Sequence, residues 1–322
     1  MNDTRYAKFF IGFFLTVATI AVFRWGVLKN TQFEYMDGEF PYWIQQKDYV
    51  QAKDDENEVL FLGDSRMKAA LIPNELCENA YNLALGGATS VEMYYTLKRY
   101  LKNHLKPKEV IAAFGGFHYQ LEDCFKPRTL YFHFLSLWEE FEAISTDGKL
   151  NAWKFQQIKT EIINALKYDL LFPQKYTAAC INSKFQRGDF NHGQCQALVN
   201  NKGHMFFGLE ESAPLNTEAE APHFTVAPRI DFYLRKIISL CKENDISLFI
   251  EQLPMNYSWD KTKAGEWYKD FFKYFSDLET QTGITIEKEI PCYEPDFFGD
   301  PSHVNPHGAK RFTAYIKEKY GL

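Results

Sequence analysis

The sequence has no run of basic residues and only a small excess of acidic ones. Its 322 residues include 36 Lys and Arg against 42 Asp and Glu, which gives a formal net charge of -6. Proteins that bind nucleic acid carry clustered positive charge, so this composition argues against a nucleic-acid partner. The eight histidines are scattered, and none has ligand spacing with an acid or cysteine cluster. We therefore expect no metal site and no cofactor.

Cysteine is also sparse, and its spacing is not that of a metal site. There are six cysteines and no C-x-x-C pair. Cys180 and Cys195 flank a polar, glycine-containing segment, INSKFQRGDFNHGQ, which has little means of ordering itself. A disulfide that closes this loop in an oxidising compartment would contribute about 3 kcal/mol in the loop-entropy model. The alternative is that all six are reduced thiols; we expect the Cys180–Cys195 disulfide.

Charge is absent altogether from one stretch near the N-terminus. Residues 9–23 read FFIGFFLTVATIAVF, and if Arg24 snorkels, the apolar stretch extends to Leu28. About 20 residues is the length that a helix needs to cross a bilayer. Arg5 and Lys8 precede the stretch and favour a cytoplasmic N-terminus. A cleaved signal peptide is the alternative, but no small-x-small cleavage site follows, so we expect an uncleaved anchor.

The apolar stretch near the N-terminus divides the chain into three predicted segments. Residues 1–29 form a short cytoplasmic stub and a transmembrane signal anchor in this prediction. Residues 30–57 look like a tether, with an interfacial helix around Tyr42 and Trp43. Residues 58–322 are then an extracytoplasmic domain on a single-pass protein of the cell membrane, on its periplasmic or outer face.

Strand and helix patterns alternate from residue 58 onward, which predicts an α/β domain with a parallel sheet. Apolar runs predict strands at residues 59–62, 80–85, 109–114, 246–250 and 284–286. Helical spacing and capping residues predict helices at residues 90–103, 228–244, 262–281 and 306–320. The span from about 120 to 227 is too long for a loop. We expect an insertion there, helical at first and irregular from residue 172, that covers the carboxyl edge of the sheet.

The first of these strands leads directly into Gly63-Asp64-Ser65-Arg66. Ligands of open α/β sheets bind at the carboxyl ends of the strands, so Ser65 is a candidate nucleophile. The alternative is that Asp64 or Ser65 only caps the helix that follows.

A second motif, DPSHVNPHG, places Asp300 three residues before His303 and just ahead of the last predicted helix. A serine nucleophile needs a base within hydrogen-bond reach, and that base needs an acceptor on its other nitrogen. Asp300 and His303 can supply both from one turn. We therefore predict that Ser65, His303 and Asp300 form a catalytic triad.

These motifs together resemble those of the SGNH (GDSL-like) hydrolase superfamily: GDSR after the first strand, glycine after the second, and D-x-x-H before the last helix. The resemblance implies a three-layer, flavodoxin-like α/β fold, with helices on both faces of a parallel sheet. It also implies that the N–H groups of Ser65 and of Gly87 (or Gly86) form an oxyanion hole.

The chain departs from the family after the third strand. The family has G-x-N there, with an asparagine donor, and this chain has Gly115-Gly116-Phe117-His118. His118 could supply the third donor, or it could make a structural hydrogen bond and leave two donors. Loss of one donor costs about 3 kcal/mol of transition-state stabilisation. Arg66, beside the nucleophile, could orient an anionic substrate or pair with a surface acid.

With its anchor, the chain is similar to the membrane-anchored SGNH-like proteins that accompany membrane-bound O-acyltransferases. These include alginate acetylation proteins and the D-alanyl transfer protein of teichoic acids. The segments NLALGGATSVEMYYTLKRYL and SLFIEQLPMN carry this narrower resemblance. It implies transfer of an O-acyl group such as acetyl, through acyl-Ser65, to a cell-surface polysaccharide or related polymer. A carbohydrate or lipid esterase and a non-catalytic accessory subunit of the acyltransferase are the alternatives.

Overall fold

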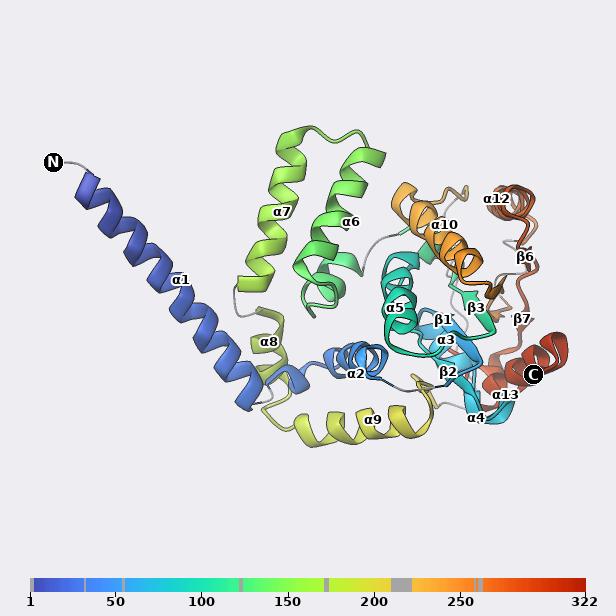
Figure 1. Cartoon of the computed structure of the whole chain (residues 1–322). Coiled ribbons are helices and arrows are strands. Elements are labelled where there is room, and N and C mark those ends of the chain that lie inside the picture. Colours follow the sequence, from blue (N-terminus) through green and yellow to red (C-terminus); the bar gives the residue numbers. More distant parts are fainter. Residues whose placement is uncertain are drawn as a thin grey trace. The chain divides into compact units, whose positions relative to one another are not determined.

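The structure, a computed structural model, describes residues 3–31, 33–53, 56–121, 124–170, 174–209, 222–257, 259 and 263–322 (Figure 1). The chain divides into two compact units. We call residues 1–44 with 125–195 the helical unit, and residues 45–124 with 196–322 the sheet unit. The insertion expected at 120–227 is therefore divided, because its first part groups with the N-terminal residues and its last part with the sheet.

The sheet unit contains a five-stranded parallel sheet in the order β2-β1-β3-β4-β6. Its strands are β1 (Val59–Gly63), β2 (Ala80–Asn82), β3 (Glu109–Ala113), β4 (Ser247–Ile250) and β6 (Thr285–Ile286). A separate parallel pair joins β5 (Met255–Asn256) to β7 (Cys292–Tyr293). The predicted parallel α/β sheet is thus confirmed.

Strand β2 is shorter than predicted and ends at Asn82, although the N–H groups of Leu83 and Leu85 still donate to carbonyl oxygens of β1. The buried Asn82 amide donates to the carbonyl oxygens of Met67 (3.0 Å) and Leu71 (3.2 Å). Its Oδ1 accepts from the N–H of Ala84 at 3.1 Å. Asn82 thereby ties the end of β2 to the helix that follows β1.

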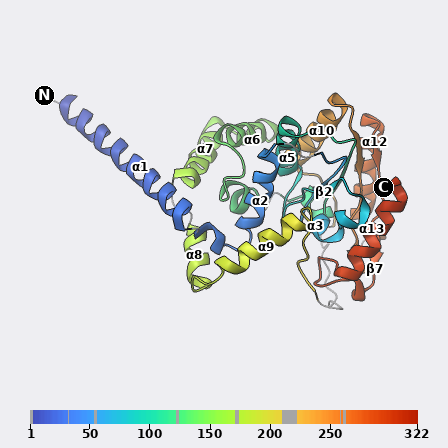
Figure 2. The same ribbon diagram turned by 60° about the horizontal axis from the view of Figure 1, so that its bottom comes forward.

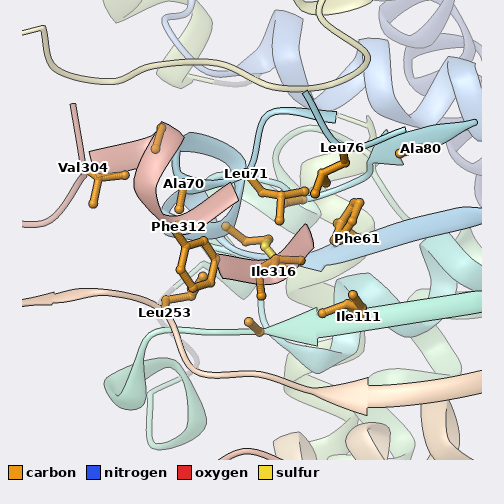
Figure 3. Packing of buried hydrophobic residues seen from close by; sticks show 14 of the residues in the cluster. Phe61, Ala70, Leu71, Leu76, Ala80, Ile111, Leu253, Val304, Phe312 and Ile316 are labelled. Carbon is orange, nitrogen blue, oxygen red and sulfur yellow. The ribbon is translucent and has the colours of Figure 1, made fainter. Parts of the chain in front are cut away.

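Helices cover both faces of this sheet, and alternate strand residues point to opposite faces. On one face lie α3 (Ser65–Ala70), α4 (Pro73–Leu76) and α13 (Pro306–Tyr320). Figure 3 shows Phe312 and Ile316 of α13 packed with Phe61 of β1 and Ile111 of β3. The helices α5 (Ser90–Asn103) and α10 (Pro228–Glu243) pack against each other and contact β1 and β4 respectively. The helix α12 (Glu266–Thr282) contacts β6, and short helices lie at Gly116–Tyr119 (η2) and Pro295–Phe297 (η4).

The helical unit begins with α1 (Asp3–Thr31). Its segment Thr4–Phe23 is long and apolar enough to cross a membrane, and its side chains are largely exposed. Then come η1 (Phe33–Met36), α2 (Phe40–Gln51), η3 (Phe125–Leu130), α6 (Leu137–Leu150), α7 (Phe155–Leu170), α8 (Gln174–Asn182) and α9 (Gly188–Asn200). Helices α2 and α9 carry residues of both units. Helices α6 and α7 run side by side in Figures 1 and 2 and contact each other.

The segment expected to be an irregular loop is helical, and its expected disulfide is wrong. Cys180 in α8 and Cys195 in α9 are both free, buried thiols, and burial raises the pKa of Cys195 to about 11. Polar contacts order this segment instead. The buried Asn191 side chain donates to the carbonyl oxygens of Tyr35 and Asp37, the latter at 2.9 Å. The hydrogen bonds of the Asn191 side-chain amide therefore order this segment in place of the expected disulfide.

The helix expected around Tyr42 and Trp43 exists as α2, but these aromatic residues are not at an interface with lipid. Both are buried. The Trp43 ring lies 5.6 Å from that of Phe132 and 5.2 Å from that of Phe134, centroid to centroid. The interfacial placement is therefore wrong, because protein side chains cover the aromatic face.

Candidate active site

The end of β1 positions Ser65 as the first residue of α3. Asp64 is the N-cap of this helix, and its Oδ1 accepts from the N–H groups of Arg66 (2.9 Å) and Met67 (3.4 Å). The capping role belongs to Asp64 and not to Ser65. The hydroxyl of Ser65 is therefore left for another partner.

That partner comes from the turn before α13. Asp300 Oδ1 accepts from the backbone N–H groups of Ser302 (2.7 Å) and His303 (2.8 Å), which folds the turn around its carboxylate. Asn305 then caps α13 by accepting from the N–H groups of His307 and Gly308, and Pro306 opens the helix. Local hydrogen bonding thus fixes the backbone on both sides of His303.

The structure brings the three predicted triad residues together. Nε2 of His303 lies 2.8 Å from Oγ of Ser65, and Nδ1 lies 2.8 Å from Oδ2 of Asp300. Burial would raise the pKa of Asp300, but the hydrogen bonds from His303 and the two backbone N–H groups hold this pKa below its usual value. If the ionised carboxylate accepts Nδ1–H, Nε2 is the ring nitrogen that can accept from the Ser65 hydroxyl.

Two backbone N–H groups near Ser65 remain available to a ligand. In the part of the chain that the structure describes, the N–H groups of Ser65 and Gly87 have no hydrogen-bond partner. Gly87 has a φ of 72°, in the left-handed region that favours glycine, whereas Gly86 does not have a positive φ. This conformational difference favours Gly87 as the position that glycine must occupy.

His118 contacts Asp64, the residue before the nucleophile. It comes from η2, is buried, and has Nδ1 2.5 Å from Oδ2 of Asp64, which also accepts the N–H of Gly115 at 2.6 Å. Burial would raise the pKa of Asp64, but His118, Arg66 and the Gly115 N–H hold this pKa below its usual value. Because the Asp64 carboxylate takes Nδ1–H, His118 could donate from Nε2 only as an imidazolium. The geometry favours the structural role for His118 over that of a third oxyanion donor.

Arg66 is buried, which argues against the alternative that it pairs with a surface acid. Its side chain is 3% exposed, and Nη1 donates to the carbonyl oxygen of Ser302 at 2.9 Å. Nη1 also lies 3.2 Å from Sδ of Met255, and the guanidinium carbon lies 5.3 Å from the centre of the Phe117 ring. Arg66 therefore ties α3, which begins with Ser65, to the turn that carries His303.

Phe207 contacts His303, and no sequence motif marks it. The two ring centroids are 4.7 Å apart at an interplanar angle of 31°, and Phe207 is 39% exposed. Its segment runs close to the Asp300 turn, because a Cβ on Gly299 would lie 2.2 Å from the carbonyl oxygen of Gly208. The only available signal was the position of Phe207 in an insertion that we expected to shape the site.

Two further buried titratable groups lie along the same segment. Nζ of Lys68 on α3 donates to the carbonyl oxygen of Gly203 at 3.0 Å, and burial lowers the pKa of Lys68 to about 7. Nε2 of His204 donates to the carbonyl oxygen of Ala69 at 3.1 Å, and burial together with the nearby Lys68 lowers the pKa of His204 to about 4. Both side chains thus hold the segment before Phe207 against α3.

Comparison with known proteins adds little to this geometry. A model of an uncharacterised protein family matches residues 213–321, which include Asp300 and His303 but not Ser65. A comparison with curated protein sequences gives no match. The family match covers about a third of the chain, so the functional argument rests on the site itself.

Proposed function

We propose that this chain is an SGNH-type O-acyltransferase in which Ser65 is the nucleophile, His303 the general base and acid, and Asp300 the residue that orients His303. One observation carries the proposal: Nε2 of His303 lies 2.8 Å from the Ser65 hydroxyl while Nδ1 contacts Asp300. Ser65 and His303 are 238 residues apart in sequence. Such a line of three side chains at the carboxyl edge of a parallel sheet matches what nucleophilic catalysis requires.

The sheet order supports the SGNH-like, flavodoxin-like fold. Counting only the strands of the large sheet in chain order, β2-β1-β3-β4-β6 becomes 2-1-3-4-5. This is the order of flavodoxin-like doubly wound sheets. The order of the motifs along the chain supports the same assignment.

The proposed reaction has two steps with the same proton carrier. Oγ of Ser65 attacks the acyl carbonyl carbon, Nε2 of His303 takes the hydroxyl proton, and the N–H groups of Ser65 and Gly87 stabilise the oxyanion. The bond to the donor oxygen breaks, and His303 returns its proton to that oxygen. An acceptor hydroxyl then attacks acyl-Ser65, gives its proton to His303, and Ser65 recovers a proton as it leaves.

The wider setting follows from the resemblance and from α1. We propose that α1 anchors the chain in the cell membrane as a single-pass protein, with the site on the periplasmic or outer face. A membrane-bound O-acyltransferase would supply the acyl group, and a cell-surface glycan or related polymer would accept it. The exposed apolar span Thr4–Phe23 supports the anchor.

The test is to trap the acyl-enzyme. Full-length protein in detergent is incubated with p-nitrophenyl acetate, and peptide mass spectrometry locates the acetyl group. We expect acetyl-Ser65 and slow release of p-nitrophenol, both absent in Ser65→Ala. Ser136→Ala, which changes an exposed capping serine of α6, is the matched control and should give acetyl-Ser65 and p-nitrophenol at the wild-type rate. Equal turnover by Ser65→Ala, or no acylated Ser65, would refute a catalytic role and favour an accessory subunit.

The acceptor separates transfer from hydrolysis, because the same triad serves both. Adding a soluble oligosaccharide to acyl-Ser65 should produce the O-acylated sugar faster than free acid if the chain is a transferase. Release of acid alone, with or without the sugar, would favour the esterase alternative.

A further inference from the structure

The hairpin formed by α6 and α7 exposes more large apolar side chains than a water-facing hairpin would. Trp138 is 75% exposed and Phe155 80% exposed. The other exposed large apolar side chains of the hairpin are Leu137, Phe141, Leu150, Ile163 and Leu166. Large apolar side chains that are exposed together mark contact with a protein partner or a membrane.

A cavity opens within this hairpin. Its volume is about 390 Å³, which lies in the range of small-molecule sites. Its lining is apolar apart from the buried Glu140, and consists otherwise of Leu137, Trp138, Phe141 and Ile144 of α6 and Ile162, Ala165 and Leu166 of α7. Trp138 and Phe141 stack on each other at its edge, with centroids 5.7 Å apart. An extended hydrocarbon chain fits such a lining.

The charged side chains of the hairpin indicate what kind of surface its apolar side chains contact. Among residues 137–167, the exposed charged side chains are all lysines: Lys149, Lys154, Lys159 and Lys167. The acidic residues of the same stretch are buried or half-buried, and Glu161 pairs with Lys126 at 3.1 Å. Exposed Trp, Phe and Leu combined with exposed Lys are typical of helices that lie in the interface of an anionic membrane.

The hairpin also contacts the helix that we propose to cross the membrane. Helix α1 contacts α7. Within the apolar span of α1, Val17 and Ala21 are half-buried although their neighbours are exposed. Residues four apart lie on one face of a helix, so Val17 and Ala21 mark the less exposed face of α1 within a span that is otherwise exposed. The hairpin is thus in contact with the helix that we propose as the membrane anchor.

From these observations we propose that the α6–α7 hairpin is a second membrane-binding element, which inserts Trp138 and its neighbours into the bilayer and holds a phospholipid acyl chain in its cavity. The four exposed lysines face the anionic headgroups. This inference rests on the proposed anchoring by α1, but not on the chemistry of Ser65. It explains why large apolar side chains are exposed here although the sheet unit buries those of its core.

Tryptophan quenching by brominated lipids tests the proposal. Full-length protein is placed, one copy per disc, in nanodiscs of phosphatidylcholine and phosphatidylglycerol with or without bromine on the acyl chains. The emission of Trp138 is the difference between wild type and Trp138→Phe. We expect bromine to lower this difference about twofold or more, as expected for an indole inserted at the acyl boundary.

Three controls make each outcome decisive. The Trp43 contribution, from wild type minus Trp43→Phe, should not change, because Trp43 is buried in protein. A tryptophan placed in the anchor by Phe13→Trp should be quenched. Lys154→Glu with Lys159→Glu should reduce the quenching of Trp138 in anionic discs only.

The possible failures point to different errors. If the tryptophan of Phe13→Trp is quenched but Trp138 is not, the anchor stands and the hairpin proposal is refuted, in favour of a protein partner or a second copy. If neither is quenched, both the anchor and the hairpin proposal fail. Trapping of acyl-Ser65 in the same discs reports separately on the proposed chemistry.

Discussion

The core of the sheet unit differs from two parts of the helical unit, helix α1 and the α6–α7 hairpin, in how large apolar side chains are exposed. In the sheet unit, Phe61, Phe312 and Ile316 are fully buried in one continuous cluster between β1, β3, α3 and α13. In the helical unit, Trp138 and Phe155 are mostly exposed, as are most side chains of the segment Thr4–Phe23 of α1. The first pattern is that of a protein core that keeps a site rigid. The second pattern is that of a surface whose apolar side chains contact something other than this chain, such as a membrane.

The sharpest test of this contrast exchanges one histidine in each unit. His303→Ala removes the base beside Ser65, and we expect the acylation rate to fall roughly 10⁴-fold or more, as for triad residues generally. His192→Ala removes a histidine that stacks on Tyr35 in the helical unit, with centroids 4.1 Å apart. We expect that variant to keep the wild-type rate. Release of p-nitrophenol measures both, and a comparable loss in both variants would mean that the chemistry is not confined to the sheet unit.

A phenylalanine pair tests burial in the two units. Phe312→Ala opens a cavity in the core of the sheet unit and should destabilise that unit by about 3–5 kcal/mol. Phe155→Ala, at an 80% exposed position, should change stability by no more than about 0.5 kcal/mol in detergent. Hydrogen exchange of β1 and α7 amides measures each unit separately. A large loss of protection from Phe155→Ala would show that this side chain packs within the protein.

Buried Lys68 should give the sheet unit a pH dependence that the helical unit lacks. The folded-state pKa of Lys68 is about 7, whereas unfolded lysine keeps its proton to about 10.4. Between these values the unfolded state binds more protons, so stability rises with pH by at most about 1.4 kcal/mol per pH unit. Lys68→Met should remove this rise. Thermal unfolding of both proteins at pH 7, 8 and 9 measures it, and parallel curves would mean that Lys68 is not desolvated.

The smallest expected difference concerns helix caps, which the two units share. Thr89 in the sheet unit and Ser136 in the helical unit each form a capping box, with Glu92 and Glu139 respectively. Thr89→Ala and Ser136→Ala should each cost about 1 kcal/mol. Hydrogen exchange in the first turns of α5 and α6 measures the cost. Because Thr89 is buried and Ser136 exposed, a larger effect at Thr89 would sharpen the contrast between the units.

The sequence allowed much of the sheet unit to be predicted, because its signals are local. Short apolar runs ending in glycine or a polar residue predicted β1 and β3 nearly to the residue. A cap at Thr89 or Ser90 and Pro306 predicted where α5 and α13 begin, and the structure has Thr89 as the cap. The close approach of Ser65, Asp300 and His303 was predictable because each motif lies at a strand end or just before a helix.

Features that depend on contacts distant in sequence were missed. Helix α9 has few apolar residues, and the buried hydrogen bonds of Asn191 that order it cannot be read from its pattern. Arg66 bonds to Ser302, which is 236 residues away in the sequence, and Phe207 contacts His303 from a distant segment of the chain. No local spacing encodes these contacts. The disulfide was wrongly expected for the same reason, because the segment looked as if it had no other means of order.

One carboxylate, that of Asp64, joins four pieces of backbone: the end of β1, the first turn of α3, Gly115 after β3, and η2 through His118. Its neighbour Ser65 contributes a hydroxyl and no cap. Although the two residues are adjacent, selection for the fold acts on Asp64 and selection for the proposed reaction acts on Ser65. Among diverging descendants of this chain, loss of the serine with retention of the aspartate would mark a protein that has abandoned the reaction but still folds. Loss of the aspartate would mark one whose fold at this edge has been rebuilt.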